Sequence, residues 1–139
     1  MNTREKTLNL VKMYKEHQRQ FEAIFAALGK AAAPGNDYGI EIRGGTEIAK
    51  EFTIVSHPCR MVFDIRLDSE SFPGKASFLR VLGPEQAQGF LNVYFDRSGN
   101  LTDDSQASAA LHAVADAATP DWLALRVLDE FFRSRETGR

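Results

Sequence analysis

The amino-terminal part of the chain carries hydrophobic side chains at helical spacing. Between Leu10 and Leu28 they recur at steps of four and three residues, which places them on one face of an α-helix. This stripe consists of Leu10, Tyr14, His17, Phe21, Ile24 and Leu28. Asn2 and Glu5 together resemble a capping box, so we predict a helix from about Thr3 to Leu28. At ~1.5 Å per residue this helix is about 39 Å long, so it either spans the whole domain or extends beyond it.

The middle of the chain changes to an alternation of hydrophobic and polar residues, which is typical of β-strands with one buried face. Three segments alternate in this way, at Tyr38, Ile40 and Ile42, at Ile48, Phe52 and Ile54, and at Met61, Phe63, Ile65 and Leu67. The opposite side of these strands is charged, and we predict that it faces solvent. Its members are Glu41, Arg43, Glu47, Glu51, Arg60, Asp64, Arg66 and Asp68.

Two turns are predicted to connect these strands. A three-residue loop at 44–46, with a glycine bulge, pairs Ile42 with Ile48. The second turn is predicted at residues 56–59, where Pro58 fixes the bend.

A further hairpin is predicted with residues 83–89 as its connection, and both of its faces are apolar. The side predicted to face the core carries Leu79, Val81, Leu91, Val93 and Phe95. The other side is predicted to be an interface and carries Phe78, Arg80, Leu82, Phe90, Asn92 and Tyr94. Phe78 lies opposite Tyr94 in this arrangement.

The apolar second face of this hairpin indicates either a docking surface or an internal contact. Aromatic residues and arginine are enriched at interface centres, and monomers seldom expose contiguous apolar patches. We therefore expect contact with a second copy, as a homodimer, or with a partner protein. In the alternative interpretation, the loop at Phe72-Pro73 or an end of the first helix covers this face within the chain.

The carboxy-terminal part of the chain is predicted to form a turn and two helices. Residues 96–100 have turn composition, and a short return strand at Leu101 can follow them. One helix is predicted from Asp104 or Ser105 to Ala118. The other runs from Thr119 to about Arg133, with an apolar stripe of Trp122, Leu125, Leu128 and Phe132. The predicted fold class is α+β, an antiparallel meander of five or six strands with the long helix and two carboxy-terminal helices packed on one face.

Composition agrees with one globular domain over residues 1–139. Apolar residues make up 43% of the chain and charged residues 26%, which are ordinary globular proportions. The single cysteine, Cys59, excludes an intrachain disulfide and favours a reducing compartment. The charged first turn is unlike a secretory signal, and no apolar run reaches membrane-spanning length, so we expect a cytoplasmic protein without membrane contact.

The net charge of −2 does not favour binding to nucleic acid or anionic lipid. The basic side of the first helix, with Lys12, Lys15 and Arg19, has the charge to meet phosphates. Acidic residues on the same helix favour a solvated face instead, and nucleic acid is not an expected partner.

Few residues have the spacing that catalysis or metal binding requires. His57 and Cys59 place a base near a thiol, but catalytic pairs of this kind normally meet through the fold, so we favour a structural role. The three histidines lie on different predicted elements, and no metal or cofactor is expected. Residues 96–102 have oxygen side chains at alternate positions, but Leu101 and Ala107 replace the glycine and the closing glutamate of a calcium loop.

These features favour a small protein-binding or adaptor protein without catalytic activity. In outline, a small chain of helix, strands and terminal helix resembles the type III secretion chaperones, which implies a dimeric binder of protein segments. The chain departs from that family's order after Leu67, where no helix is predicted between the two groups of strands. The alternative is a small enzyme or small-molecule-binding protein whose site assembles only in three dimensions, with a pocket at His57, Cys59 or Arg80.

Overall fold

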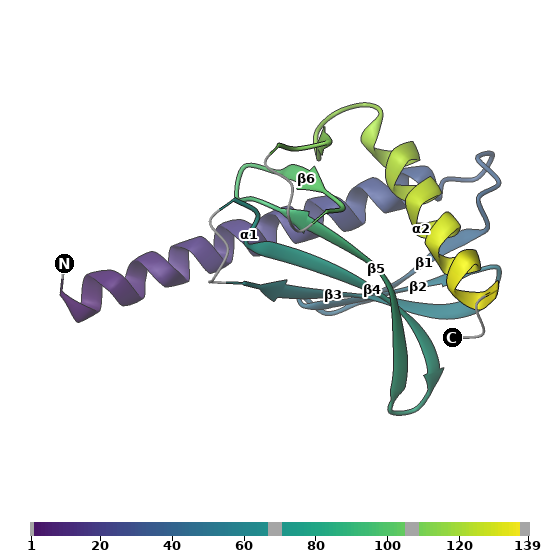
Figure 1. Cartoon of the computed structure of the whole chain (residues 1–139), viewed down its shortest axis with the longest axis horizontal. Helices are drawn as coiled ribbons and strands as arrows, with labels where there is room; N and C mark the ends of the chain where they lie inside the picture. The colour runs from purple at the N-terminus through teal and green to yellow at the C-terminus, as the bar shows by residue number, and fades with distance from the viewer. Residues whose placement is uncertain (1, 67–70, 105–108, 137–139) are drawn as a thin grey trace.

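The structure is a computed structural model that describes residues 2–66, 71–104 and 109–136. It contains an amino-terminal helix, a seven-stranded antiparallel sheet in which every strand pairs with the next along the chain, and a carboxy-terminal helix (Figure 1). In order, the elements are α1 (Thr3–Ala31), β1 (Ile40–Gly45), β2 (Ala49–Ile54), β3 (His57–Ile65), β4 (Gly74–Gly83), β5 (Gln86–Phe95), β6 (Asn100–Thr102), β7 (His112–Ala113) and α2 (Thr119–Glu136). The predicted α+β class and the antiparallel meander are confirmed, and the strand number is seven instead of five or six.

Helix α1 begins as the capping pattern predicts. The backbone N–H of Glu5 donates to Asn2 Oδ1 at 2.8 Å, which satisfies one of the free donors of the first turn. The predicted stripe is buried from His17 to Leu28, and the helix continues to Ala31. Figure 1 shows that its first turns project well beyond the sheet, so of the two alternatives the helix extends past the domain.

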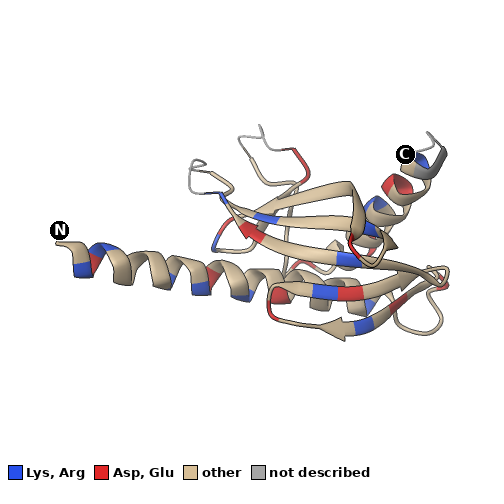
Figure 2. Cartoon of the chain, turned by 90° about the horizontal axis from the view of Figure 1, so that it is seen from below, with Lys and Arg blue, Asp and Glu red and all other residues tan. Residues whose placement is uncertain are grey.

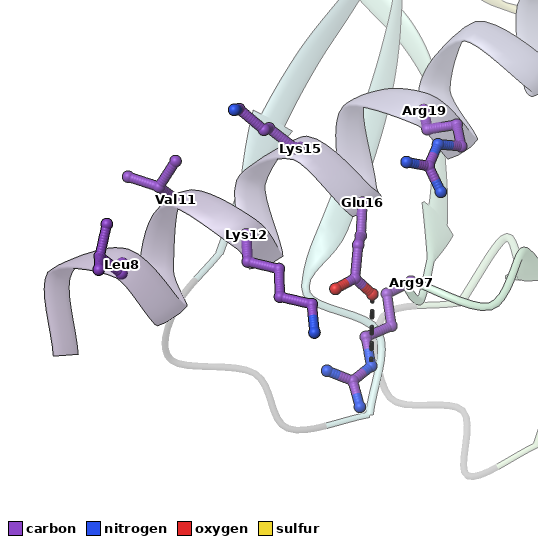
Figure 3. Close-up of a pocket in the computed structure, with 7 residues that line it drawn as sticks. All are labelled: Leu8, Val11, Lys12, Lys15, Glu16, Arg19 and Arg97. Atoms are coloured by element: carbon purple, nitrogen blue, oxygen red, sulfur yellow. Dashed lines mark ion pairs between the residues drawn. The ribbon is translucent and has the colours of Figure 1, made fainter. Parts of the chain in front are cut away.

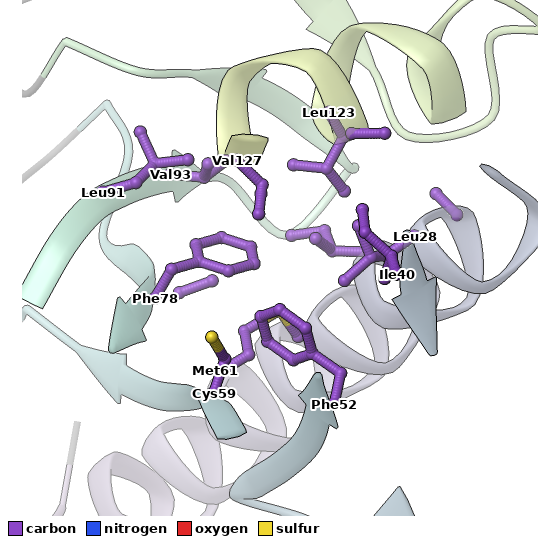
Figure 4. Packing of buried hydrophobic residues seen from close by; sticks show 14 of the residues in the cluster. Leu28, Ile40, Phe52, Cys59, Met61, Phe78, Leu91, Val93, Leu123 and Val127 are labelled. Carbon is purple, nitrogen blue, oxygen red and sulfur yellow. The ribbon is translucent and has the colours of Figure 1, made fainter. Parts of the chain in front are cut away.

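Both helices pack against one face of the curled sheet and enclose the hydrophobic core (Figures 1 and 4). Side chains from all layers meet there, including Leu28, Phe52, Met61, Phe78, Val93, Leu123 and Val127. Full burial of one such side chain contributes roughly 1.5–3 kcal/mol, so this core is the main source of stability. The close fit explains Gly74, because a Cβ there would lie 2.4 Å from the Phe95 ring.

The predicted helix between Asp104 or Ser105 and Ala118 is wrong where the structure describes it. Residues 105–108 lie outside the described part, and residues 109–118 form turns and the short strand β7. β7 pairs with β6, and the Leu111 N–H donates to the Leu101 carbonyl at 2.8 Å. The alanine-rich segment has helix propensity but only two large apolar side chains, Leu111 and Val114, and propensity alone does not sustain a short helix.

Helix α2 begins at Thr119 as predicted and ends at Glu136, but it is rotated relative to the predicted stripe. Its core positions are Leu123, Ala124, Val127 and Phe131. Of the predicted stripe, Trp122 and Leu128 are partly buried, whereas Leu125 is 55% and Phe132 43% exposed. Because neighbouring helix positions are about 100° apart, a shift of the buried positions by one residue presents another apolar face of the helix to the sheet.

The first two hairpins differ from the predicted registers. Ile42 pairs with Phe52 instead of Ile48, the loop shifts to residues 46–48, and a bulge lies between Ile42 and Gly44, before the predicted loop. The second turn consists of Val55 and Ser56, both at positive φ.

As a result Pro58 lies inside β3, opposite Thr53, instead of in the predicted bend. The outer side of these strands is charged as predicted (Figure 2). Ion pairs join Arg43 to Glu41 at 3.4 Å and Arg60 to Glu51 at 3.2 Å. Asp68 lies outside the described residues.

Candidate functional site

The residues of the predicted hairpin interface do not share one exposed face. Phe78, Arg80 and Phe90 are at most 9% exposed. Leu82 and Asn92 are exposed, and Tyr94 is half-buried. The intramolecular alternative therefore describes the first three residues, although Phe131 of α2, and not the loop at Phe72-Pro73 or an end of the first helix, lies over Arg80 and Phe90. A contact of Leu82, Asn92 or Tyr94 with a partner remains a prediction.

The pairing of β4 with both of its neighbours, β3 and β5, explains this division. The two strands are joined by a two-residue turn at Pro84-Glu85, so residues 83–89 are largely strand and not the predicted loop. Phe78 consequently pairs with Leu91 instead of Tyr94, and both face the core. A bulge next to Phe78 turns Phe90 inward as well, because an extra residue reverses the alternation.

Arg80 is a charged side chain in the core. It is 4% exposed, and its guanidinium lies over the Phe131 ring of α2, 4.2 Å from the ring centre. Nη2 donates to the backbone carbonyl of Phe131, and Nη1 lies 3.5 Å from Gln88 Oε1. These contacts join β4 and β5 to α2, which is a structural role.

His57 and Cys59 lie on β3 beside this cluster. The His57 ring is 5.6 Å from that of Phe131, and Cys59 is 2% exposed opposite Arg80. Burial raises the pKa of the Cys59 thiol from 9.0 to about 12, although the positive charge of Arg80 acts in the opposite direction. A thiol of this kind is neutral and shielded at physiological pH, so it lacks the properties of a nucleophile.

A hollow of about 500 Å³ lies between β5 and α2. Its lining includes the predicted interface residues Phe90, Asn92 and Tyr94. The charged groups of its wall already bind one another: Arg126 Nε lies 2.8 Å from Asp103 Oδ2, and Nη1 lies 3.2 Å from Glu130 Oε1. A ligand would therefore have to displace these internal ion pairs.

The projecting start of α1 carries several exposed large hydrophobic side chains close together. Every residue from Asn2 to Lys12 is exposed. We call residues 2–12 the overhang. Leu8 is 49%, Leu10 51% and Val11 43% exposed, and Tyr14 just beyond is 45% exposed.

One side of the overhang combines apolar and basic side chains. A shallow hollow of about 620 Å³ is lined by Leu8, Val11, Lys12, Lys15, Glu16, Arg19 and Arg97 (Figure 3). Arg97, from the turn after β5, lies 3.8 Å from Glu16, its ion-pair partner. We call Leu8, Val11, Lys12, Lys15, Arg19 and Arg97 the outer face. The lysines and Arg19 are those that the sequence suggested for phosphate contacts.

The opposite side of the overhang forms an angle with the end of β3. A hollow of about 320 Å³ there is lined by Leu10, Met13, Tyr14, Asp64 and Ile65, which we call the inner corner. The Tyr14 ring packs edge-on against Phe63, 5.3 Å between centres. The inner corner therefore begins where the buried stripe of α1 leaves the core.

From the sequence, the basic side chains of the outer face indicated possible phosphate contacts but favoured a solvated face, and the inner corner was not identified. The available signal was the length of the helix, together with apolar positions that continue to Leu10, but nothing in the sequence showed where the sheet ends.

Among the described residues, no group of three or more His, Cys, Asp or Glu side chains is close enough to hold a metal ion, and no helix is both long and apolar enough to cross a bilayer.

Comparison with protein-family models, with curated proteins and with solved structures finds no match to this chain.

Proposed function

We propose that the chain is a protein-binding domain without catalytic activity, and that its outer face binds an acidic segment of a partner protein. The observation that carries this proposal is the outer face itself, where Leu8 and Val11 are 49% and 43% exposed beside a group of basic side chains. Interfaces place apolar side chains centrally and charged ones at the rim, and this surface has both in one place.

The charges of this surface favour an acidic partner. Residues 2–19 contain five basic side chains (Arg4, Lys6, Lys12, Lys15 and Arg19) and two acidic ones (Glu5 and Glu16), whereas the whole chain has a net charge of −2. A partner with carboxylates around one or two apolar side chains would match both the cations and the leucine–valine pair. A nucleic-acid backbone would meet the cations but would leave the apolar pair without a contact.

The alternative function, a small enzyme or small-molecule-binding protein, has less support. The Cys59 thiol is buried with a raised pKa, and His57 lies against Phe131. The hollow between β5 and α2 is the feature that favours a ligand, but its Arg126 is already bound by Asp103 and Glu130.

Site-specific photo-crosslinking tests the proposal. The photo-crosslinking amino acid p-benzoylphenylalanine replaces Val11 in one variant. In the control variant it replaces Val55, which is 68% exposed on the remote β2–β3 turn. In cells of the source organism, we expect a protein adduct from position 11 that is absent from position 55, with the crosslinked peptide rich in Asp and Glu. Adducts with lipid or nucleic acid, or equal adducts from both positions, would contradict the proposal.

Charge reversal on the outer face provides a second measurement. Lys15→Glu combined with Arg19→Glu is expected to reduce the position-11 adduct roughly fivefold or more, because rim charges act on association with an acidic partner. Lys30→Glu is the matched control, since Lys30 is an exposed basic residue near the far end of the same helix. An adduct that survives the double reversal would show that the cations have no part in binding.

A further inference from the structure

We propose that the inner corner of one chain binds the overhang of a second copy, so that two chains pair through antiparallel overhangs related by a two-fold axis near Leu10. This surface lies on the opposite side of α1 from the outer face, and the inference does not depend on the proposed function.

The first argument is the continuity of the apolar stripe. Leu10 and Tyr14 are 51% and 45% exposed, and they continue at four- and three-residue steps into His17, which is 1% exposed. This alternation of four and three is the spacing with which one helix packs along another. The core covers the stripe from Leu28 back to His17 and leaves the next two positions, Tyr14 and Leu10, about half exposed.

The second argument is the stability of the overhang as a helix. Thr3, Thr7 and Asn9 are poor helix formers, and the end of a helix frays where no other surface packs against it. The Asn2 cap contributes only about 1 kcal/mol. Packing of Leu10 and its neighbours against another surface would supply the missing stabilisation.

The third argument is complementary charge. In an antiparallel pair centred on Leu10, positions at equal distances on either side lie opposite each other, so Lys6 of the second copy faces Tyr14. Tyr14 lines the inner corner together with Asp64, an exposed residue of β3. The two-fold axis forms this lysine–aspartate contact twice, and it uses only residues of this chain.

The position of the other cations is compatible with self-pairing. At about 100° per residue, Lys12 and Arg19 lie roughly opposite Leu10 on the helix and point away from the contact. Their repulsion across the dimer is therefore weakened by distance and by salt. An isologous contact also closes after two copies, so the exposed stripe would not lead to fibres.

Engineered cysteines test the geometry. The native thiol of Cys59 is buried, so an added cysteine is the reactive one. In mild oxidant, Leu10→Cys is expected to give a disulfide-linked dimer because the two copies of residue 10 meet at the axis. Lys12→Cys, two residues along on the opposite side, is the control and should remain monomeric on a non-reducing gel. Equal crosslinking of both variants would overturn the proposed arrangement.

A charge swap measured by sedimentation velocity tests whether Lys6 of one copy contacts Asp64 of the other. Asp64→Lys alone and Lys6→Glu alone are each expected to raise the dimer dissociation constant roughly tenfold, because each contact occurs twice. The double variant exchanges the signs and should return to within about threefold of the wild type. A wild type that is monomeric at all attainable concentrations, or a double variant that dimerises more weakly than either single variant, would disprove the dimer.

Lys15→Glu with Arg19→Glu should leave the dimer unchanged, because both residues lie on the outer face. A failure of the proposed dimer is therefore distinguishable from a failure of the proposed function.

Discussion

At the scale of single residues, the reactivity of the Cys59 thiol beside Arg80 is determined by burial under helix α2. Cys59 and Arg80 are directly opposite on neighbouring strands, an arrangement that would activate a thiol on an open surface. Phe131 lies over the Arg80 guanidinium and closes the cluster. Burial therefore outweighs the positive charge, and the pKa of the thiol rises to about 12.

The titration of Cys59 is a prediction at this scale. Because its folded pKa of about 12 exceeds the ordinary value of 9.0, the unfolded chain releases the thiol proton first. The contribution of this group to stability is complete below pH 9 and is lost as the pH rises towards 12. In urea unfolding, the wild type should lose stability relative to Cys59→Ala between these values. A constant difference between the two proteins would show that the thiol titrates normally.

At the scale of elements, each helix has one face selected by the sheet. The stripe of α1 was correctly predicted from His17 to Leu28, where one apolar face runs along the helix. Helix α2 offers several apolar positions, and the set predicted from the sequence includes Leu125 and Phe132, which are 55% and 43% exposed. The choice between such faces depends on the surface that the helix meets, which local spacing does not describe.

Two leucines of α2 test which face is buried. Leu123→Ala is expected to lower the free energy of unfolding by about 2 to 5 kcal/mol, since Leu123 is fully buried. Leu125→Ala, on the exposed side, should change it by less than about 0.5 kcal/mol. Urea denaturation of both variants measures the two values under the same conditions. The reverse order would mean that α2 packs through the stripe predicted from the sequence.

At the scale of the whole molecule, a core enclosed by two helices is joined to an exposed helical extension. The core side chains are almost completely buried, whereas every residue of the overhang is exposed. Local stability should therefore fall along α1 from its carboxy-terminal half towards Asn2. Binding to the overhang would raise that local stability without changing the core.

Hydrogen exchange at two protein concentrations tests this difference along one helix. Amides of residues 3–12 should exchange rapidly in dilute protein and more slowly in concentrated protein, because dimerisation covers them. Amides of residues 21–31 are expected to be protected at both concentrations, since their stripe lies in the core. Exchange in the overhang that does not depend on concentration would argue against a second copy at the inner corner.

The sequence by itself determined the elements whose signals are local. The capped α1, the antiparallel strands, the turn at residues 96–99 and the start of α2 follow from periodicity, capping and turn residues within single segments. The exposed charged side of the first strands was predictable for the same reason, because alternation assigns the two sides of a strand.

Only the tertiary structure decided the registers and therefore the surfaces. Pairing with β3 places Phe78 opposite Met61 and Arg80 opposite Cys59, so both lie in the core instead of in the predicted interface. Such a change is physically small, since a shift of one residue turns every side chain of a strand to its other face. The exposure of the overhang likewise depends on where the sheet ends, which is set by contacts between segments far apart in the chain.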